Sequence, residues 1–377
     1  MPSPPAEVIL LEPFFKGSHA AWARGYARRS RLRVRLVTLE GIHWKWRFHH
    51  SAMHFAEILS REFTPPSALL VSAVTDAAAL RGLLPPAWAE VPIHLYFHEN
   101  QLTYPLPPGE ARDLHYAWLQ VQSCRAARSC VFNSHFHKRD FLGALPAFLR
   151  SFPDHRPLSL AGEIEKKSRV VPPGVETALF RKAREKARPG KGPLRILWNH
   201  RWEADKEPGL FLEVLLSLAR EGLPFQVVLA GAGSEALDPE SEARVRALGE
   251  RVVHRGYAPR EAYPELLASC HVLVSTSRHD FFGISVAEGM AAGLLPLLPD
   301  RQNYPFLLPP GPSGEPGEKW KNLCLFRAPG ELAEKLRVLA ERPARALEAE
   351  EAMALRARAF DLARTARTMD SLLEEGG

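Results

Sequence analysis

The feature that most constrains the fold is a repeated alternation of short apolar segments with longer segments of helical pattern. In the first half of the chain, apolar runs of strand length lie at residues 6–15, 31–40, 67–74, 91–100 and 128–134. Strands that alternate with helices along a chain favour a parallel sheet covered by helices on both faces. We therefore predict an α/β fold with a doubly wound parallel sheet.

The alternation stops near residue 150 and begins again with strands predicted at residues 194–202, 225–233, 251–257, 270–277 and 294–300. The 377 residues also exceed what one hydrophobic core usually supports, roughly 250–300 residues. We predict a Rossmann-like domain over 1–175, a linker over 176–192 and a second Rossmann-like domain over 193–355. Residues 356–377 are expected to form a C-terminal helix that packs back on the first domain.

Composition bears on compartment and partners. No run approaches about 18 apolar residues without a charge, so no membrane span is predicted. The N-terminus lacks a basic segment followed by a long apolar one, so we expect no signal peptide and a cytoplasmic protein. The four cysteines form no CxxC pair and are expected to be small buried side chains. The net charge of +6 permits an anionic partner without requiring one.

The strongest motif is the segment STSRHDFFGISVAEG in the second half. A predicted strand ends at Ser275, a loop with Gly283 follows, and a helix begins near Ser285. Backbone N–H groups at such a turn can bind an anion, and Asp280 and Glu288 bracket the turn. Glu288 could accept two hydrogen bonds from a ribose diol, or it could merely complement the helix N-terminus.

A second motif, WNHRWEADKEPG, follows another predicted strand and carries Asn199, His200, Arg201 and Lys206. Ligands of open α/β sheets bind at the carboxyl ends of the strands. An arginine fork with a lysine point charge suits a diphosphate. The alternative is an exposed loop with scattered charges.

Two weaker signals end predicted strands in the first half. In FKGSH, Gly17 permits a close backbone approach to a ligand and Ser18 is placed to cap a helix, although an ordinary strand-to-helix turn looks the same. In YFHENQLTYP, the polar residues His98, Glu99 and Asn100 follow a strand, where a histidine can also be purely structural.

Several familiar motifs are absent from the sequence. There is no DxD pair to hold a divalent metal, no GxGxxG fingerprint of a nicotinamide enzyme and no GxSxG elbow of an α/β-hydrolase. We therefore expect no bound metal and no redox cofactor. The charge of a diphosphate would be met by Arg201, Lys206 and backbone N–H groups.

The segment HWKWRFHHSAMHF, residues 43–55, admits three interpretations. His50 and His54 have the spacing of two metal ligands on a helix, but Ser51 stands where a zincin would have glutamate. Aromatic rings between cations suit single-stranded RNA, whose bases stack on rings. The third interpretation is a helix that packs its edge, with Trp44, Phe48, Ala52 and Phe55 on one buried face. Arginines alternating over residues 31–36 are equally a solvated strand face.

Taken in order, these motifs resemble the retaining glycosyltransferases of family 4, which have the GT-B fold. VVPPGVETALF resembles the crossing into their second domain, and DFFGISVAE resembles their E-x7-E motif with Asp280 in place of the first glutamate. Within that group, LEPFFKGSH, WKWRFHHSAMHFA, YFHENQLTYP and FNSHFHKRDFL look like the tRNA-queuosine alpha-mannosyltransferase family.

The resemblance implies two Rossmann-like domains that face a central cleft. It also implies a retaining transfer of mannose from GDP-mannose to the cyclopentenediol of queuosine in tRNA, with no metal or further cofactor. Catalytic roles would fall to Arg201, Lys206, His98 and Asp280. Donor binding would fall to Gly17, Ser18, Asn199, Gly231, Gly233, Tyr257, Phe282, Gly283, Ile284 and Glu288. Acceptor binding would fall to His19, Trp44, Lys45, Trp46, Arg47, His50, Glu99, Asn100 and Asn133.

Two alternatives remain open. One is a family 4 glycosyltransferase that acts on a lipid, a polysaccharide or a small molecule. The other is a protein that binds a sugar nucleotide without catalysis, although Glu288, Arg201 and Lys206 argue against the loss of an active site.

Overall fold

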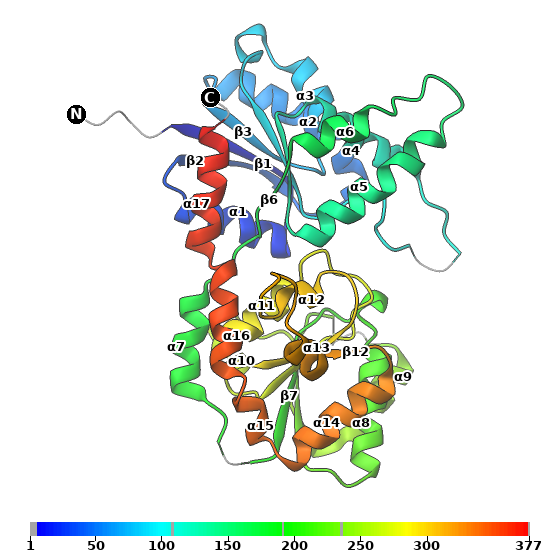
Figure 1. Cartoon of the computed structure of the whole chain (residues 1–377). Helices are drawn as coiled ribbons and strands as arrows, with labels where there is room; N and C mark the ends of the chain where they lie inside the picture. The colour runs from blue at the N-terminus through cyan, green and yellow to red at the C-terminus, as the bar shows by residue number, and fades with distance from the viewer. Residues whose placement is uncertain (1–5, 107–108, 191, 234–236, 376–377) are drawn as a thin grey trace, which may run out of the picture. The chain divides into compact units, whose positions relative to one another are not determined.

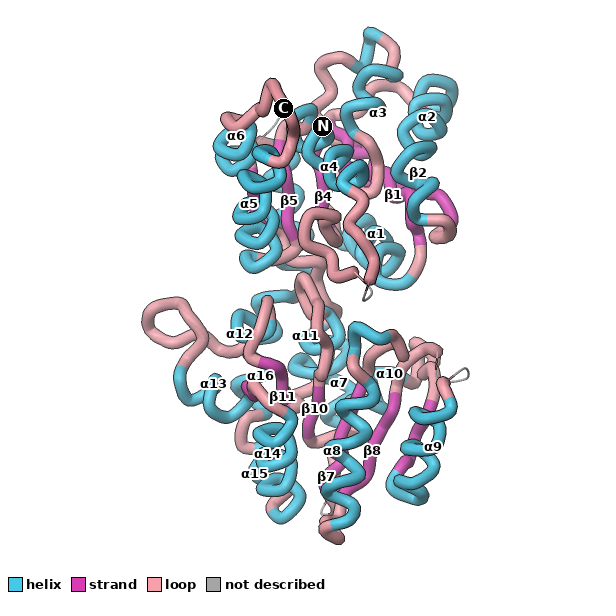
Figure 2. Tube along the Cα trace, turned by 90° about the vertical axis from the view of Figure 1, so that its right-hand side faces the viewer, coloured by secondary structure: helices cyan, strands magenta, loops and turns pink. Residues whose placement is uncertain are grey.

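Two parallel sheets organise the chain in the computed structural model, which describes residues 6–106, 109–190, 192–233 and 237–375 (Figure 1). The chain divides into two compact units, the first of Met1–Gly174 with Leu362–Gly377 and the second of Val175–Asp361. Each unit contains one six-stranded sheet with helices on both faces, which is the predicted fold class (Figure 2). Among the described residues, no helix is both long and apolar enough to cross a membrane.

The strands of the first sheet have the order β2-β1-β3-β4-β5-β6, and all neighbours are parallel. Their bounds are β1 (Glu7–Phe15), β2 (Arg33–Glu40), β3 (Ala68–Ser72), β4 (Ile93–Phe97), β5 (Ser129–Phe132) and β6 (Ser168–Val170). The five strands predicted for this half are confirmed. The sequence did not predict β6, because three residues are too few to show a pattern.

Helices cover this sheet on both faces: α1 (Gly17–Arg29), α2 (Trp44–Glu62), α3 (Ala77–Leu83), α4 (Leu114–Ala126), α5 (His135–Arg150), α6 (Leu160–Lys166) and α17 (Leu362–Glu374). Alternate residues of β1 enter different cores. Ile9 and Leu11 pack with α2 to α6, whereas Val8 and Leu10 pack with α1 and α17. Burial on both faces explains why β1 is an uninterrupted apolar run.

The C-terminal helix α17 belongs to the first unit, although it follows the second unit in sequence. Buried Asp370 on this helix accepts hydrogen bonds from the Tyr26 hydroxyl (2.9 Å), the Ser30 hydroxyl (2.6 Å) and the Arg31 backbone N–H (2.8 Å). Three donors satisfy the buried carboxylate and fix the helix against α1. The division falls before Leu362, so residues 356–361, predicted as part of this helix, lie in the second unit.

The second sheet has the order β12-β11-β10-β7-β8-β9, again entirely parallel. Its strands are β7 (Leu194–Trp198), β8 (Phe225–Leu229), β9 (Val252–Arg255), β10 (Val272–Val274), β11 (Leu295–Pro299) and β12 (Leu325–Phe326). The five strands predicted for the second half are confirmed, whereas the two-residue β12 was not predicted.

The helices of the second unit are α7 (Thr177–Ala187), α8 (Pro208–Arg220), α9 (Pro239–Leu248), α10 (Tyr263–Ala268), α11 (Ile284–Ala291), α12 (Tyr304–Leu307), α13 (Glu318–Cys324), α14 (Pro329–Glu341), α15 (Ala344–Leu347) and α16 (Glu350–Ala357). Short 3-10 turns add η1 (Pro86–Trp88) in the first unit, and η2 (Ala204–Lys206), η4 (Gly249–Arg251) and η5 (Arg358–Phe360) in the second. All four cysteines are buried and free, as expected.

The segment 176–192 is not the linker that the sequence predicted, because α7 occupies most of it and packs against α10 and α11. Phe180 and Ala183 are buried, and the basic run contains a buried cation. The Arg184 guanidinium donates to the carbonyls of Ala268 (2.6 Å) and Cys270 (2.8 Å) and pairs with Glu350 (3.0 Å). The charged residues that suggested a loose linker therefore belong to an amphipathic helix.

Candidate active site

The two motifs of the second half meet at one edge of the second sheet. β7 delivers Asn199, His200 and Arg201 at its carboxyl end, and the neighbouring β10 delivers Ser275 to Ser277 at its own. Parallel neighbours place their carboxyl ends at the same edge, where open α/β sheets bind ligands. The structure thus brings the two sequence-predicted motifs together.

Lys206 joins the two motifs directly. Its buried ammonium donates to the His279 carbonyl (2.8 Å) and the Ser277 hydroxyl (3.1 Å), and it pairs with Asp280 (3.2 Å) and Asp205 (3.0 Å). Burial alone would lower the pKa of Lys206, but the two carboxylates raise it above its ordinary value. The ammonium therefore stays charged within the site.

Asp280 is likewise held by its surroundings. One carboxylate oxygen faces Lys206 and the other accepts a hydrogen bond from the Tyr304 hydroxyl. Burial would raise the pKa of Asp280, but Lys206 and the hydrogen bonds lower it below its ordinary value. No sequence motif predicted a role for Tyr304, whose hydroxyl also lies 2.9 Å from the Ser275 hydroxyl.

Arg201 has a different environment from Lys206. Its side chain is 64% exposed and pairs with Glu203 at 2.8 Å. Such an exposed pair contributes little stability, so the guanidinium can turn toward an anionic ligand at small cost.

Glu288 is the final acceptor of a short hydrogen-bond chain. Asn199 donates to the Tyr263 hydroxyl (2.9 Å), which donates to the Glu288 carboxylate (3.0 Å). Burial raises the pKa of Glu288 to about 7, against the opposing effects of Tyr263 and Arg260. Glu288 lies beyond the first turn of α11, which contains no acid, so the alternative of a simple N-terminal charge is disfavoured.

The loop after β7 carries buried polar atoms that lack a hydrogen-bond partner: Asn199 Oδ1, His200 Nε2 and Trp202 Nε1. Buried polar groups are nearly always hydrogen-bonded, so this loop is suited to receive a polar ligand. Burial lowers the pKa of His200 to about 4, so this imidazole is neutral at pH 7.

The glycines predicted for donor binding have identifiable steric roles. A Cβ on Gly231 would lie 1.7 Å from the His200 carbonyl oxygen, so only glycine lets the loop after β8 approach the loop after β7. Gly233 (φ 92°) and Gly283 (φ 89°) adopt left-handed conformations, and Gly283 is the N-cap of α11. Beside Gly283, Phe282 is buried against Phe360 and Ile284 begins the helix, whereas the more distant Tyr257 is 70% exposed.

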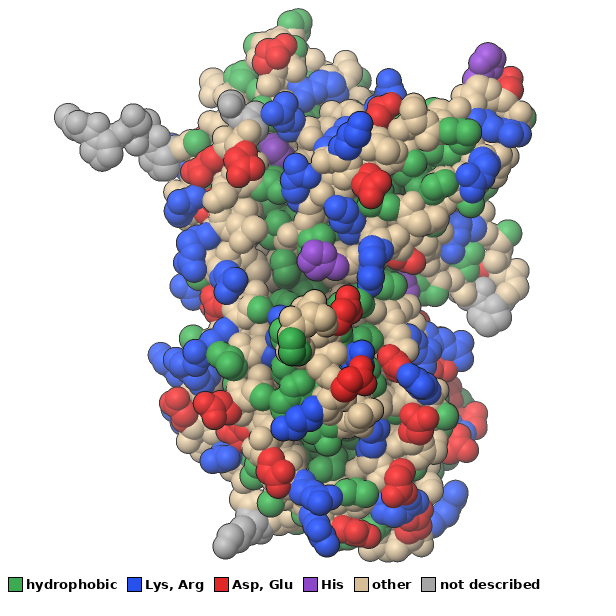
Figure 3. All heavy atoms as spheres, in the orientation of Figure 1, with side chains coloured by type: hydrophobic (Ala, Val, Ile, Leu, Met, Phe, Trp, Pro, Cys, Tyr) green, Lys and Arg blue, Asp and Glu red, His purple; other side chains and the backbone are tan. Residues whose placement is uncertain are grey.

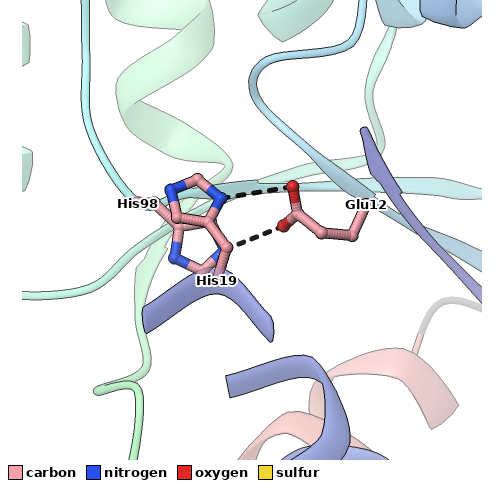
Figure 4. A group of neighbouring side chains, drawn as sticks. All are labelled: Glu12, His19 and His98. Carbon is pink, nitrogen blue, oxygen red and sulfur yellow. Dashed lines mark hydrogen bonds and ion pairs between the residues drawn. The ribbon is translucent and has the colours of Figure 1, made fainter. Parts of the chain in front are cut away.

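In the first unit, the carboxyl edge of the sheet gathers Glu12, His19 and His98 (Figure 4). Glu12 lies in the C-terminal half of β1 and is fully buried. Its carboxylate lies 3.2 Å from His19 Nδ1 and 3.3 Å from His98 Nε2. The two imidazoles stack with centroids 3.9 Å apart. The sequence predicted both histidines but not Glu12, although a carboxylate inside the run VILLEPFF was a signal that could have been used.

Electrostatics keep this group in a defined state. Burial would raise the pKa of Glu12, but the two imidazoles lower it well below its ordinary value. Burial lowers the pKa of His98 to about 4. At neutral pH the group therefore contains an ionised carboxylate beside a neutral His98.

Two expectations about this edge need correction or refinement. Ser18 does not cap α1: the N-cap is Lys16, Gly17 begins the helix with φ 52°, and Ser18 is its exposed second residue. The side chains of Asn100 and Asn133 make hydrogen bonds within the first unit, although Asn100 Nδ2 is buried without a hydrogen-bond partner. Asn100 accepts from the Thr103 backbone, while Asn133 donates to the His98 carbonyl (2.8 Å) and thereby holds the loop after β4, where Glu99 is partly buried.

The segment 43–55 forms the start of α2, and its packing is mostly as predicted. Phe48, Ala52 and Phe55 are buried, but Trp44, expected on the same face, is 40% exposed. Trp44 opens the helix beyond the core, so its ring contacts only the edge of the apolar layer.

Exposed and partly exposed rings from α2 and α4 form what we call the α2–α4 aromatic surface, which consists of Trp44, Trp46, His49, His50 and His115. Trp46 is 55% exposed and stacks on His50, and His49 stacks on His115. Nearby, the Lys45 ammonium lies 5.7 Å from the Trp44 ring, and the Arg47 guanidinium donates to the Glu40 carbonyl. His50 and His54 stack at 5.6 Å and belong to no group of three metal-ligating side chains among the described residues.

Comparison with known proteins agrees with this architecture. The family model "tRNA-queuosine alpha-mannosyltransferase N-terminal" matches residues 7–175, and "Glycosyl transferases group 1" matches residues 180–319. The chain is 32% identical over 312 residues to the tRNA-queuosine alpha-mannosyltransferase of Drosophila melanogaster, covering 80% of this chain and 81% of the relative.

Solved structures show the same fold at low sequence identity. Anabaena HepE in complex with UDP and glucose is 16% identical with a TM-score of 0.65, covering 98% of this chain and all of that one. Sucrose-phosphate synthase of Thermosynechococcus elongatus is 15% identical with a TM-score of 0.69, covering 98% of each chain. These are GT-B glycosyltransferases, which confirms the predicted fold class. With the match to its relative across both units, the chain belongs to the tRNA-queuosine alpha-mannosyltransferase family.

Proposed function

We propose that this protein transfers mannose from GDP-mannose, with retention of configuration, to the cyclopentenediol of queuosine in tRNA. The observation that carries the proposal is the 32% identity to a tRNA-queuosine alpha-mannosyltransferase over 80% of the chain. The geometry of both units supports its separate parts.

The edge of the second sheet supplies what a nucleotide-sugar donor requires. Lys206 and the exposed guanidinium of Arg201 would stabilise the negative charge of the diphosphate. Glu288, already ordered by Tyr263, would accept hydrogen bonds from the ribose diol. Backbone N–H groups at the Gly283 turn would add donors at the start of α11.

The proposed reaction is a front-face displacement. The bond between the anomeric carbon and the diphosphate breaks, and a bond to the acceptor oxygen forms on the same face of the sugar. The leaving diphosphate oxygen takes the proton of the acceptor hydroxyl, so no strong protein base is needed. Lys206 and Arg201 would stabilise the diphosphate as its charge develops.

For the acceptor, we assign RNA contact to the α2–α4 aromatic surface. Its exposed rings offer platforms on which splayed bases can stack, and Lys45 and Arg47 lie beside them. Charge alone is less informative, because Figure 3 shows cations interspersed with carboxylates on the visible faces. The strand arginine Arg33, for example, pairs with Glu7 at 3.4 Å. A tRNA acceptor would place the reaction in the cytoplasm.

The proposal requires no metal. Lys206 already supplies a positive charge at the proposed donor site. In DxD enzymes, a divalent ion supplies the positive charge that stabilises the diphosphate. Transfer that continues unchanged in excess EDTA is the expected result, and dependence on Mg²⁺ or Mn²⁺ would contradict this part.

The test is incubation of the protein with GDP-mannose and queuosine-containing tRNA, followed by nuclease digestion and mass spectrometry of the nucleosides. We expect queuosine to gain one hexose, and NMR of the product to show the α anomer. The same tRNA with guanosine in place of queuosine is the matched control and should gain nothing. Absence of hexose on queuosine, with transfer to a lipid, a glycan or a small molecule instead, would favour the first alternative.

A further inference from the structure

Hydrogen bonds join the Glu288 side chain to α10 and to the loop after β7 in a fixed order. Asn199 Nδ2 donates to the Ser285 carbonyl of α11 (3.2 Å), and because a carbonyl only accepts, the NH₂ group of Asn199 must face this side. The same Nδ2 donates to the Tyr263 hydroxyl (2.9 Å), whose own proton is then directed to Glu288 Oε2 at 3.0 Å. Asn199 therefore sets the direction in which the Tyr263 hydroxyl donates.

This chain leaves two acceptor atoms at the same edge of the sheet. Among the described residues, the Glu288 carboxylate accepts one hydrogen bond, at Oε2, so Oε1 makes none with them. Asn199 Oδ1 is buried and has no hydrogen-bond partner. A buried acceptor without a partner is rare in a folded protein, and a ribose diol presents two O–H donors. The arrangement is therefore suited to a ligand that donates hydrogen bonds.

We propose that Tyr263 and Asn199 are positioning residues, which hold the Glu288 carboxylate as an ionised acceptor for the ribose diol of the donor. The inference rests on the proposed function, because it assumes that the ligand at Glu288 is a sugar nucleotide. Tyr263 acts on Glu288 in two ways. Its hydroxyl fixes one carboxylate oxygen in place, and its donated hydrogen bond favours the charged form of the carboxyl group.

The hydrogen bond from Tyr263 matters because the surroundings of Glu288 disfavour its charged form. Burial raises the pKa of Glu288 to about 7, while the Tyr263 hydrogen bond and Arg260 oppose the rise. Glu288 therefore changes charge within the neutral range, and loss of the Tyr263 hydroxyl should raise its pKa further. A hydrogen bond to a charged acceptor is roughly twice as strong as one to a neutral acceptor, so protonation should weaken the contact with the diol.

The other charged groups around α11 are already paired or hydrogen-bonded. α11 packs chiefly on α16, α7 and β11, and β11 contains no ionisable side chain. Arg184 of α7 pairs with Glu350 of α16 at 3.0 Å, and Arg356 of α16 donates to the Phe306 carbonyl at 2.6 Å. The groups that act on the titration of Glu288 are therefore chiefly Tyr263 and Arg260.

The nearby groups of the proposed donor site do not titrate between pH 6 and 9. Despite burial, two carboxylates hold the pKa of Lys206 above 10.5, and Lys206 holds the pKa of Asp280 below 3.8. Burial lowers the pKa of His200 to about 4. A pH dependence of binding that appears in this range and requires the diol therefore reports the charge of Glu288.

The first experiment is titration calorimetry of the full-length protein with GDP and with 2′,3′-dideoxy-GDP from pH 6 to 9. The two ligands share the base and the diphosphate, so the ratio of their Kd values isolates the contribution of the diol. For wild type we expect this ratio, dideoxy-GDP over GDP, to fall by roughly 5- to 10-fold from pH 9 to pH 6, with its midpoint near 7. A ratio that does not change with pH would overturn the inference.

The second experiment repeats the titrations with Tyr263→Phe. Phenylalanine keeps the ring, including its edge contact with Phe180 (centroids 6.1 Å apart), and removes only the O–H group. The midpoint of the ratio should move to higher pH, so that the diol contributes less at pH 7 and regains its effect toward pH 9. Asn199→Ala should move the midpoint in the same direction, because the Tyr263 hydroxyl loses the group that directs it. In the Tyr263→Phe background, Asn199→Ala should not move the midpoint further.

Tyr26→Phe is the matched control, because the Tyr26 hydroxyl also donates to a buried carboxylate, that of Asp370 in the first unit (2.9 Å). This variant should leave the midpoint of the ratio unchanged. If Tyr263→Phe also leaves the midpoint unchanged, or weakens the binding of both ligands equally at every pH, the Tyr263 hydroxyl has only a structural role and the inference fails.

These results can be told apart from a failure of the proposed function. If the protein adds hexose to queuosine while the ratio of Kd values is independent of pH, the proposed function stands and this inference falls. If wild type binds UDP in place of GDP, the proposed donor fails. The ratio measured with UDP and 2′,3′-dideoxy-UDP then decides the role of Tyr263.

Discussion

Replacing Lys206 by alanine should show that this residue contributes to stability as well as to turnover. From the sequence, alanine at either Lys206 or Arg201 is expected to lower turnover far more than stability. The structure changes this expectation for Lys206, whose ammonium is buried between Asp280 and Asp205. Removing one partner of a buried ion pair leaves the other charge uncompensated, which typically costs about 3–5 kcal/mol.

The local geometry narrows the expected loss in the free energy of unfolding of Lys206→Ala. The Asp280 side chain is 24% exposed and keeps its hydrogen bond from Tyr304, so part of its charge remains solvated in the variant. We therefore expect Lys206→Ala to lower the free energy of unfolding of the second unit by about 3 kcal/mol, at the low end of that range. Asp280→Asn should weaken the same pair, and the double variant should be less destabilised than the sum by about 1–3 kcal/mol.

Urea unfolding and hydrogen exchange of β7 and β10 measure this loss locally. Arg201→Ala is the matched control, because its exposed pair with Glu203 should be worth less than about 0.5 kcal/mol. Arg201→Ala should instead lower kcat by about 100-fold through lost stabilisation of the diphosphate. Unchanged unfolding of Lys206→Ala, or strict additivity with Asp280→Asn, would refute the buried-pair argument. Near-normal transfer by Arg201→Ala would remove its catalytic role.

Three further perturbations follow from the geometry. Because burial raises the pKa of Glu288 from 4.5 to about 7, the folded protein binds this proton more tightly than the unfolded chain, and stability should fall as pH rises from 4.5 to 7; urea titrations of Glu288→Gln should show a flatter pH profile. Gly231→Ala should destabilise the second unit by more than about 2 kcal/mol and weaken donor binding, since its Cβ would meet the His200 carbonyl at 1.7 Å. Gly330→Ala, with open space around its Cβ, should leave the free energy of unfolding unchanged in the same urea titrations. Trp46→Ala should weaken tRNA binding by about 1–3 kcal/mol without changing its salt dependence. Lys45→Ala should instead reduce the slope of log K against log salt concentration by about 1. Equal effects of both variants on this slope would argue against base stacking.

Most strands could be predicted from the sequence, because a buried parallel strand is a short, continuous apolar run. β1 and β7 are apolar runs that end in polar or glycine-containing turns, and the topology brings those turns to one edge. The segment after β6 was harder, since α7 has a narrow apolar face among many charges. Its burial depends on α10 and α11, which lie far away in sequence.

Side-chain partnerships were the part of the site that the sequence could not supply. Tyr263 and Tyr304 come from helices that carry no recognisable motif, yet they hold Glu288 and Asp280. Glu12 and His98 are 86 residues apart in the sequence, and only the β1-β3-β4 order brings them together. Such contacts depend on the order of the strands in the sheet. The sequence pattern predicts the fold class but not that order.

Asp280 departs from the E-x7-E motif, and its contacts in the structure indicate what the shorter carboxylate does. The resemblance to the E-x7-E motif assigns this position a contact with the sugar and leaves open whether the shorter aspartate can reach it. In the structure the carboxylate is oriented by Lys206 on one side and by Tyr304 on the other. An aspartate at this position keeps Lys206 charged and fixed, which would serve the diphosphate of the proposed donor even without a sugar contact. A glutamate would extend the carboxylate by one methylene past Lys206, so the shorter side chain favours electrostatic support of the lysine over direct recognition of the sugar.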